Sequence, residues 1–544
     1  MLFTSYEFIL LLCALFLLYY GLPKVTRGRI PALQWSILLV FGYLFYLYSG
    51  VQYLFFILFT TLSSYFVARL IERHAEREDA YLKERKEELS KEERKAYKAK
   101  GKRARRAVLT VGLVLNFGLL AVLKYTAFAV TNLNAVLHTF GAEVTIAVPA
   151  LLLPMGISFY TFQTMGYLID VYRRKTHAET NVAKLMLFVS FFPQLVQGPI
   201  SRHSDLAHQL YEKHDFSGES FYKGFQRVLW GYCKKLIVAD RVMIAIKTLL
   251  EKPEDYTGCY AFLLIILYSI QIYADFTGGI DITIGVAEML GIRLRENFRR
   301  PFSSRSTEEY WKRWHITMGT WFQDYIFYPL AVSEGMLRLT KWSRERFGRF
   351  GKRISRRLSV YFCTIVTWFL TGLWHGAGWN FIVWGLLNCL VLLVSQELKP
   401  LYERFHKKFP RLTASAPYGV FMAVRTFLLM GFIRVLDCYR DVPLTFRMVG
   451  SIFTEWNIGA LLSGGILDLG LSVFDFCVLG VGILVMYAVS RLGDDATGTG
   501  TLRDKLWQKP LLSACLCGIM LLAVILLGTY GPGYDASQFI YNQF

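Results

Sequence analysis

Long apolar runs recur along this chain and constrain its fold more than any other feature of the sequence. A helix of about 20 apolar residues spans the hydrocarbon core of a bilayer. Because unpaired backbone groups are costly in lipid, runs of this length form helices rather than open strands. We therefore predict an all-α polytopic membrane protein with about twelve transmembrane helices. The runs lie near residues 5–22, 32–49, 51–70, 107–129, 148–170, 258–280, 357–376, 378–396, 417–437, 473–490 and 511–530, with a more amphipathic crossing at 222–250.

The net charge of +20 comes from the loops between these runs rather than from a surface that binds nucleic acid. Lysine and arginine collect in the cytoplasmic loops of membrane proteins. If the basic segment 72–106 lies in the cytoplasm, the N-terminus lies outside, and an even number of crossings places the C-terminus outside as well. We expect a multi-pass protein of the inner, cytoplasmic membrane with no nucleic-acid partner.

The sequence shows no repeat and no soluble domain of useful size, so we predict that residues 1–544 form one membrane domain. Its longest polar insert, 72–106, mixes acidic and basic residues at helical spacing. This charge pattern is typical of a solvated cytoplasmic helix or helical pair that extends two spans. A docking arm for anionic lipid or a cytoplasmic partner is the alternative. Residues 450–544 are expected to add further spans and an outward-facing tail.

Two segments are predicted to enter the membrane without crossing it. Residues 184–200 hold two prolines and a glycine in too short a run, and residues 307–331 combine aromatic and charged side chains. Broken or polar backbone at membrane depth is tolerated only where protein or a water-filled cavity covers it. Both segments are therefore candidates for lining an internal site.

His375 is the strongest candidate for a catalytic residue. It follows Trp374 and lies beside Gly376 and Gly378, between two strongly apolar runs. An ionisable side chain at this depth is costly and marks a functional site by default. Burial keeps an imidazole neutral, and a neutral imidazole can accept a proton from a hydroxyl. A core histidine that bonds a neighbouring carbonyl is the alternative.

His315 is the second candidate, and it lies among Trp311, Trp314 and Trp321. Aromatic residues at a membrane interface often act only as anchors, so one interpretation of this segment is an interfacial belt. The other is that His315 orients an acyl donor or shares proton transfer with His375. The two hypotheses differ in whether the imidazole of His315 points into a cavity.

Three charged residues in or beside the apolar runs are weaker candidates for shaping a site. Asp275 and Asp281 lie on either side of Gly278 and Gly279. An uninterrupted helix would put the two carboxylates on opposite faces, whereas a break at the glycines would turn both inward. Purely structural hydrogen bonds are the alternative role. Arg300 could bind a phosphate or carboxylate of a cytoplasmic donor, or it could only extend its guanidinium to the membrane surface.

Five segments, taken in order, carry a resemblance to a known family. They are LPMGISFYTFQTMGYLIDVYR at 153–173, SFFPQLVQGPISR at 190–202, YADFTGGIDITIGVAEMLGIRLRENFRRPF at 273–302, STEEYWKRWHITMGTWFQDYIFYPL at 306–330 and LTGLWHGAGWNFIVWG at 370–385. With these motifs the chain resembles the membrane-bound O-acyltransferase family over roughly residues 1 to 450. Within the family it is similar to the bacterial branch that serves alginate O-acetylation and teichoic acid D-alanylation.

The resemblance implies a ring of helices, with re-entrant or interfacial helices, around a thin central tunnel. The family's two histidines correspond to His315 and His375, and the second is the proposed catalytic residue. Trp314 and Trp374, which precede them, would shape the site. Residues 424–437 match the family's arginine-containing span only loosely.

The chain closes with QFIYNQF, which is similar to a C-terminal tyrosine motif of this branch. By that likeness Tyr541 is a candidate acyl relay. The alternative is that the aromatic tail has no chemical role and only packs at the outer surface.

The implied activity is that of an O-acyltransferase, most simply an O-acetyltransferase. The donor would be a cytoplasmic thioester, acetyl-coenzyme A or an acylated carrier protein, and the acceptor a hydroxyl of an extracytoplasmic polysaccharide or relay protein. An extracytoplasmic esterase-like transferase of the SGNH type, or other polysaccharide machinery, is the implied partner. No tightly bound cofactor and no metal are expected. The alternatives are D-alanyl transfer to teichoic acid and a non-catalytic transporter, although the internal repeats that transporters tend to show are not visible.

Overall fold

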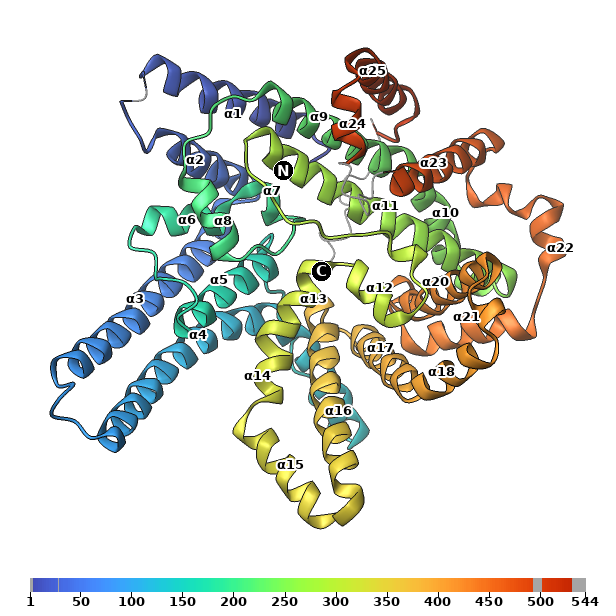
Figure 1. The fold of residues 1–544 in the computed structure, drawn as a ribbon. Coiled ribbons are helices and arrows are strands. Elements are labelled where there is room, and N and C mark those ends of the chain that lie inside the picture. The colour runs from blue at the N-terminus through green and yellow to red at the C-terminus, as the bar shows by residue number, and fades with distance from the viewer. Residues whose placement is uncertain (1–2, 28, 493–500, 531–544) are drawn as a thin grey trace. The chain divides into compact units, whose positions relative to one another are not determined.

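The computed structural model describes residues 3–27, 29–492 and 501–530, and for residues 348–350, 352–354 and 356 it describes the backbone alone. The described residues form helices joined by loops and contain no strand (Figure 1), which confirms the all-α prediction. Nine of the described helices are long and apolar enough to cross a membrane. The apolar helix α2 (Leu33–Leu47) is too short to be counted among these nine. The expected number of about twelve crossings therefore stays a prediction.

The chain divides into two compact units, residues 1–221 with 286–294 and residues 222–285 with 295–544. In the first unit α3 packs against α4 and α5, and α2 packs against α1 and α6. The helices of this unit, besides α2, are α1 (Tyr6–Val25), α3 (Leu54–Glu84), α4 (Lys91–Thr139), α5 (Ile157–Tyr172), α6 (Val182–Ser190), α7 (Phe192–Leu195) and α8 (His203–Tyr211).

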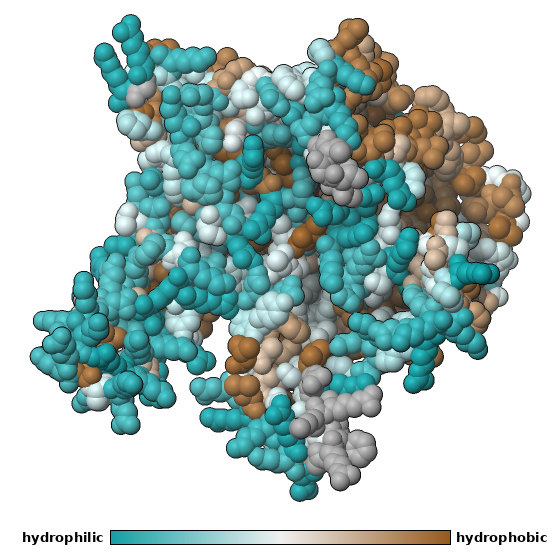
Figure 2. All heavy atoms as spheres, in the orientation of Figure 1, coloured by the Kyte–Doolittle hydropathy of each residue, from teal (hydrophilic) through white to brown (hydrophobic). Residues whose placement is uncertain are grey.

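The charged segment 72–106 forms the end of α3 and the start of α4, which lie side by side as a hairpin (Figure 1). Ser90 caps α4, because its hydroxyl accepts a hydrogen bond from the Glu93 amide while the Glu93 carboxylate accepts one from the Ser90 amide. This reciprocal pair satisfies two amides at the helix start. A buried ion pair between Glu78 and Arg105 joins the two helices. The surface of the hairpin is hydrophilic (Figure 2), and its location in the cytoplasm stays a prediction.

The predicted crossing at 148–170 is wrong in its first half. Residues 142–154 form no helix, and α5 begins only at Ile157. Pro154 has no amide hydrogen to continue a helix backwards, and Gly156 has a φ of 73°, which breaks the helical path. Close packing also requires a glycine there, since a Cβ on Gly156 would lie 2.4 Å from the carbonyl oxygen of Leu195.

In the second unit, α11 (Cys259–Met289) runs through Gly278 and Gly279 without a break, so the uninterrupted helix is the one observed of the two arrangements that the sequence left open. The glycines serve close packing instead. A Cβ on Gly278 would lie 2.9 Å from the carbonyl oxygen of Gly231 on α9 (Gly218–Tyr232), and one on Gly231 would lie 2.6 Å from that of Gly278. Small residues allow two helix backbones to approach this closely. α9 continues through a π-helical stretch, Cys233–Ala239, into α10 (Asp240–Glu251).

The segment 307–331 is broken, as its composition predicts, into α12, α13, a π-helical stretch and α14. A long hairpin follows, in which α16 packs against α15 and then against α17, and α17 packs against α20. These helices are α12 (Thr307–Arg313), α13 (Ile316–Phe322), α14 (Tyr328–Ala331), α15 (Glu334–Arg346), α16 (Gly348–His375), α17 (Trp379–Glu397), α18 (Lys399–Lys408), α19 (Pro410–Thr413), α20 (Ala416–Tyr439), α21 (Val442–Thr454) and α22 (Ile458–Ala460).

The last helices are α23 (Val473–Leu492), α24 (Leu502–Trp507) and α25 (Pro510–Leu527). Hydrophobic side chains gather on the surface over α23 and α25 (Figure 2). Leu484 is 68% exposed and Leu511 is 80% exposed. Large apolar patches on a protein surface mark contact with lipid or with another protein.

Candidate functional site

His375 lies at the turn between α16 and α17. It is the last residue of α16, and Gly376 and Gly378 flank the short link to α17. A Cβ on Gly376 would lie 2.1 Å from the ring of Phe381, so only glycine lets Phe381 pack beneath this turn. Gly372, one turn earlier, likewise permits α17 to approach, since a Cβ there would lie 2.5 Å from the Phe381 carbonyl oxygen. The glycines thus bring the aromatic start of α17 next to His375.

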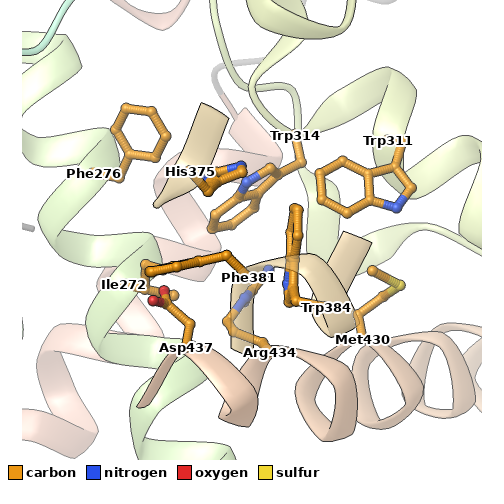
Figure 3. A pocket seen from close by; sticks show the side chains of 10 residues that line it. All are labelled: Ile272, Phe276, Trp311, Trp314, His375, Phe381, Trp384, Met430, Arg434 and Asp437. Atoms are coloured by element: carbon orange, nitrogen blue, oxygen red, sulfur yellow. The ribbon is translucent and has the colours of Figure 1, made fainter. Parts of the chain in front are cut away.

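The side chain of His375 lines a cavity of about 40 Å³, which has room for about three water molecules. Three indoles and two phenyl rings lie among its lining residues (Figure 3). The ring centroid of Trp384 lies 4.6 Å from that of the imidazole. The cavity therefore holds one imidazole in largely apolar surroundings. Its other lining residues are Ile272, Phe276, Trp311, Trp314, Phe381, Met430, Arg434 and Asp437.

His315 is held rigidly at the start of α13. Its φ of 49° is in the left-handed region, which is strained for a side chain of this size and is common at active sites. The side-chain oxygen of Asn297 accepts hydrogen bonds from the Thr317 amide at 3.0 Å and the Thr317 hydroxyl at 2.9 Å. The same oxygen lies 3.3 Å from Nδ1 of His315. Because that oxygen only accepts, Nδ1 carries the proton, and Nε2 is the basic nitrogen of the ring.

The imidazole of His315 is fully buried. Burial, together with the neighbouring imidazole of His375, holds the pKa of His315 well below its ordinary value, so this ring is neutral near pH 7. Trp374 contacts both histidines, with ring centroids 5.9 Å from His315 and 5.0 Å from His375. The structure thus brings together the two histidines that the sequence singled out, with the indole of Trp374 against both. The cavity wall itself includes His375 and not His315.

Trp314 belongs to the cavity wall and to an aromatic cluster behind it. Its ring stacks on Tyr310 with centroids 5.7 Å apart and meets Phe298 edge-on at 5.0 Å. The guanidinium of Arg434 lies over the Trp314 ring, 4.3 Å from the ring centroid. Trp314 therefore links the broken segment 307–331 to α20.

The two aspartates proposed to shape the site do not line the cavity. Asp281 accepts from Nε of Arg227 at 2.9 Å and from Nζ of Lys234 at 2.5 Å. Asp275 lies 2.6 Å from Nζ of Lys235, and both side chains are fully buried. Their contacts are those of an ion-pair network between α11 and the helix before it, which favours the structural alternative.

Arg300 is also absent from the cavity wall. It has a left-handed backbone, with φ of 48°, and its carbonyl oxygen accepts from the Arg313 guanidinium at 3.4 Å. Tyr541 lies outside the described residues. Among the residues that the structure describes, no three His, Cys, Asp or Glu side chains are close enough together to hold a metal ion.

Sequence reasoning assigned no role to several residues of the cavity wall, among them Phe381, Trp384, Arg434 and Asp437. A signal for the last two was present, because both are ionisable and lie at the end of the apolar run 417–437. Ionisable groups in such a run face the interior or a cavity and mark functional sites. The two aromatic residues carried no signal of their own, since each lies among apolar neighbours in the run 378–396.

Comparison with known proteins places this geometry in a family. The family model of membrane-bound O-acyltransferases matches residues 173–340. A protein of Azotobacter vinelandii named probable alginate O-acetylase is 33% identical over 73% of this chain and 69% of its own length. The peptidoglycan O-acetyltransferase of Helicobacter pylori is 28% identical over 73% of this chain and 71% of its own. The teichoic acid D-alanyltransferase of Bacillus subtilis is 25% identical over 50% of this chain and 65% of its own.

Proposed function

The chain belongs to the membrane-bound O-acyltransferase family, and from this premise we propose that it moves an acetyl group from a cytoplasmic thioester to a hydroxyl outside the membrane. Membership makes it a multi-pass membrane protein and an O-acyltransferase. The alternative of a non-catalytic transporter is therefore not retained. The donor we propose is acetyl-coenzyme A or an acylated carrier protein, and the acceptor is an extracytoplasmic polysaccharide or a relay protein.

The observation that carries the proposal is the imidazole of His375 in the wall of a small aromatic cavity. Acyl transfer needs a base for the proton of the attacking hydroxyl, and a positioned histidine contributes about 10²- to 10⁴-fold to such a step. It also needs the exclusion of water, which would otherwise hydrolyse the thioester. A half-buried imidazole among aromatic rings meets both needs.

In this mechanism His375 takes the proton from the acceptor hydroxyl as its oxygen attacks the thioester carbon. The same proton then passes to the leaving thiolate, so the imidazole ends the cycle neutral. His315 acts as the second histidine, and its fixed ring orients the site through Trp374, which it contacts. Trp314, on the cavity wall, holds the acyl group away from water.

The acetyl group is favoured over D-alanine by the names of the relatives. The relatives at 33% and 28% identity are named for O-acetyl transfer, and the one named for D-alanyl transfer is 25% identical over a shorter part of this chain. An extracytoplasmic esterase-like transferase of the SGNH type is the partner that we propose to complete the transfer. In this scheme Tyr541 is the acyl relay, and its hydroxyl takes the acyl group from the thioester, so its replacement by phenylalanine would abolish both acyl transfer from the thioester and acylation of the final acceptor.

The direct test is mass spectrometry of cell-surface polymers from cells with and without the gene, combined with transfer of radiolabelled acetyl from acetyl-coenzyme A by the protein in proteoliposomes. We expect O-acetyl groups on the polymer only in cells that carry the gene. The exposed His406 on α18 provides a matched control, since His406→Ala should leave polymer acetylation unchanged. D-alanyl esters in place of acetyl esters would overturn the choice of acyl group, and unchanged polymers would overturn the proposed function.

A further inference from the structure

Arg434 is a buried cation in the middle of the candidate site. Its residue is only 6% exposed, although it lies on α20, one of the helices long and apolar enough to cross a membrane. Its guanidinium donates to the hydroxyl of Tyr310 and lies over the ring of Trp314. In the part of the chain that the structure describes, no carboxylate forms an ion pair with it. A charge buried without a counter-ion is costly, so it needs a functional reason.

Asp437, one turn further along α20, carries the opposite charge but forms no hydrogen bond with this guanidinium in the part of the chain that the structure describes. One of its carboxylate oxygens accepts a hydrogen bond from the Tyr268 hydroxyl at 2.8 Å. The other is buried, and no hydrogen bond to it occurs within the described residues. Arg434 and Asp437 project from the same helix into the cavity that His375 also lines (Figure 3). The cavity thus presents a base and a guanidinium to the same small space.

We propose that Arg434 is a catalytic residue that stabilises the oxyanion formed during acyl transfer, an inference that rests on the proposed function. When the hydroxyl oxygen bonds to the thioester carbon, the carbonyl electron pair moves onto its oxygen and the hydroxyl proton moves to His375. The guanidinium donates to this negatively charged oxygen. When the carbonyl re-forms, the carbon–sulfur bond breaks and the thiolate takes the proton from His375, so atoms and charges balance.

The surroundings make this interaction strong. Donors fixed before the reaction and aimed at developing charge are worth more in a water-poor site than in bulk solvent. Trp314 and Tyr310 fix the guanidinium plane, so little reorganisation is needed when the charge appears. Removing one such donor from an oxyanion site typically lowers kcat by about 10²- to 10³-fold.

The test compares Arg434→Gln with Arg425→Gln, a matched change on the same helix at a residue that does not line the cavity. Each purified full-length variant is assayed in proteoliposomes with acetyl-coenzyme A and with fluoroacetyl-coenzyme A. We expect Arg434→Gln to lower kcat for acetyl transfer by about 10²- to 10³-fold with little change in KM. The defect should be at least several-fold smaller for fluoroacetyl transfer, because fluorine stabilises the same oxyanion through its own electron withdrawal.

An equal loss with both donors would mean that Arg434 only supports packing, and a raised KM with unchanged kcat would mean that it binds a ground-state anion. Either result overturns the inference. If Arg434→Gln does not accumulate in the membrane, Arg434→Lys replaces it, because lysine keeps the charge but lacks the planar pair of N–H groups. Arg434→Lys is assayed with the same two thioesters and must show a larger loss of kcat with acetyl-coenzyme A than with fluoroacetyl-coenzyme A. If the unmodified protein transfers no acetyl group from either thioester, the proposed function fails instead.

Discussion

Replacing Asp281 tests quantitatively whether the charged residues of α11 stabilise the folded protein or take part in the reaction. The Asp281 side chain is 15% exposed, and it is paired with Arg227 and Lys234, which are 11% and 6% exposed. Asp281→Asn keeps the size of the side chain but leaves two buried cations without this counter-charge. Removing one partner of a buried ion pair costs about 3–5 kcal/mol. Arg227 retains Glu296 as a second partner, at 2.7 and 2.6 Å, so we expect a loss near the lower end, about 3 kcal/mol.

The matched control is Glu308→Gln, which makes the same chemical change in an exposed pair. Glu308 and Lys312 are 72% and 70% exposed and lie 2.5 Å apart. Exposed pairs contribute about 0–1 kcal/mol. The free energy of unfolding of the two purified variants is measured by chemical denaturation in the same detergent.

We expect Asp281→Asn to lose clearly more stability than Glu308→Gln, while the acetyl-transfer rate per folded molecule stays near that of the unmodified protein. The reasoning is refuted if the two variants are equally stable. It is also refuted if Asp281→Asn is stable but inactive, since the aspartate would then belong to the reaction site.

Two further predictions concern other buried groups. Trp384→Leu should lower kcat by on the order of 100-fold because it removes the ring packed against the His375 imidazole, whereas Trp342→Leu, at a side chain 53% exposed, should have no effect on the same assay. His203, packed against aromatic rings in the first unit, has its pKa lowered by burial to about 4, so the unfolded chain binds its proton first. Stability should therefore fall as pH decreases from about 6.5 to about 4, by up to about 1.4 kcal/mol per pH unit for this group. His203→Gln should make the unfolding free energy less dependent on pH in that window, and an unchanged slope in denaturation series from pH 7 to 4 would contradict this account.

Local patterns predicted the helices well where length and hydropathy decide the structure. The runs 258–280, 378–396 and 417–437 correspond to α11, α17 and α20, because a long apolar segment has few alternatives to a helix in lipid. The prediction at 148–170 failed because Pro154 and Gly156 make the helix begin at Ile157, although the apolar run begins earlier in the sequence. Hydropathy alone does not weigh these two backbone effects.

Tertiary packing explains the other failures. The local pattern left a helix break at Gly278 open as one of two alternatives, because the contact that explains this glycine is with Gly231, a residue on a different helix. The histidines were paired through a family resemblance rather than through spacing, since 60 residues separate them in the sequence. Residues 424–437 match the family's arginine-containing span only loosely, so the place of Arg434 in the site became apparent only when α11, the segment 307–331, α17 and α20 closed a cavity around it.

The central claim is that His375 performs base catalysis inside its aromatic cavity. The most direct measurement is the rate of acetyl transfer by purified His375→Gln in proteoliposomes, beside His406→Gln as the exposed control and with the unfolding midpoint of each variant recorded. We predict that kcat of His375→Gln falls by about 10²- to 10⁴-fold while its unfolding midpoint stays near that of the control. A stable His375→Gln protein that transfers acetyl groups within a few-fold of the His406→Gln rate would contradict the claim.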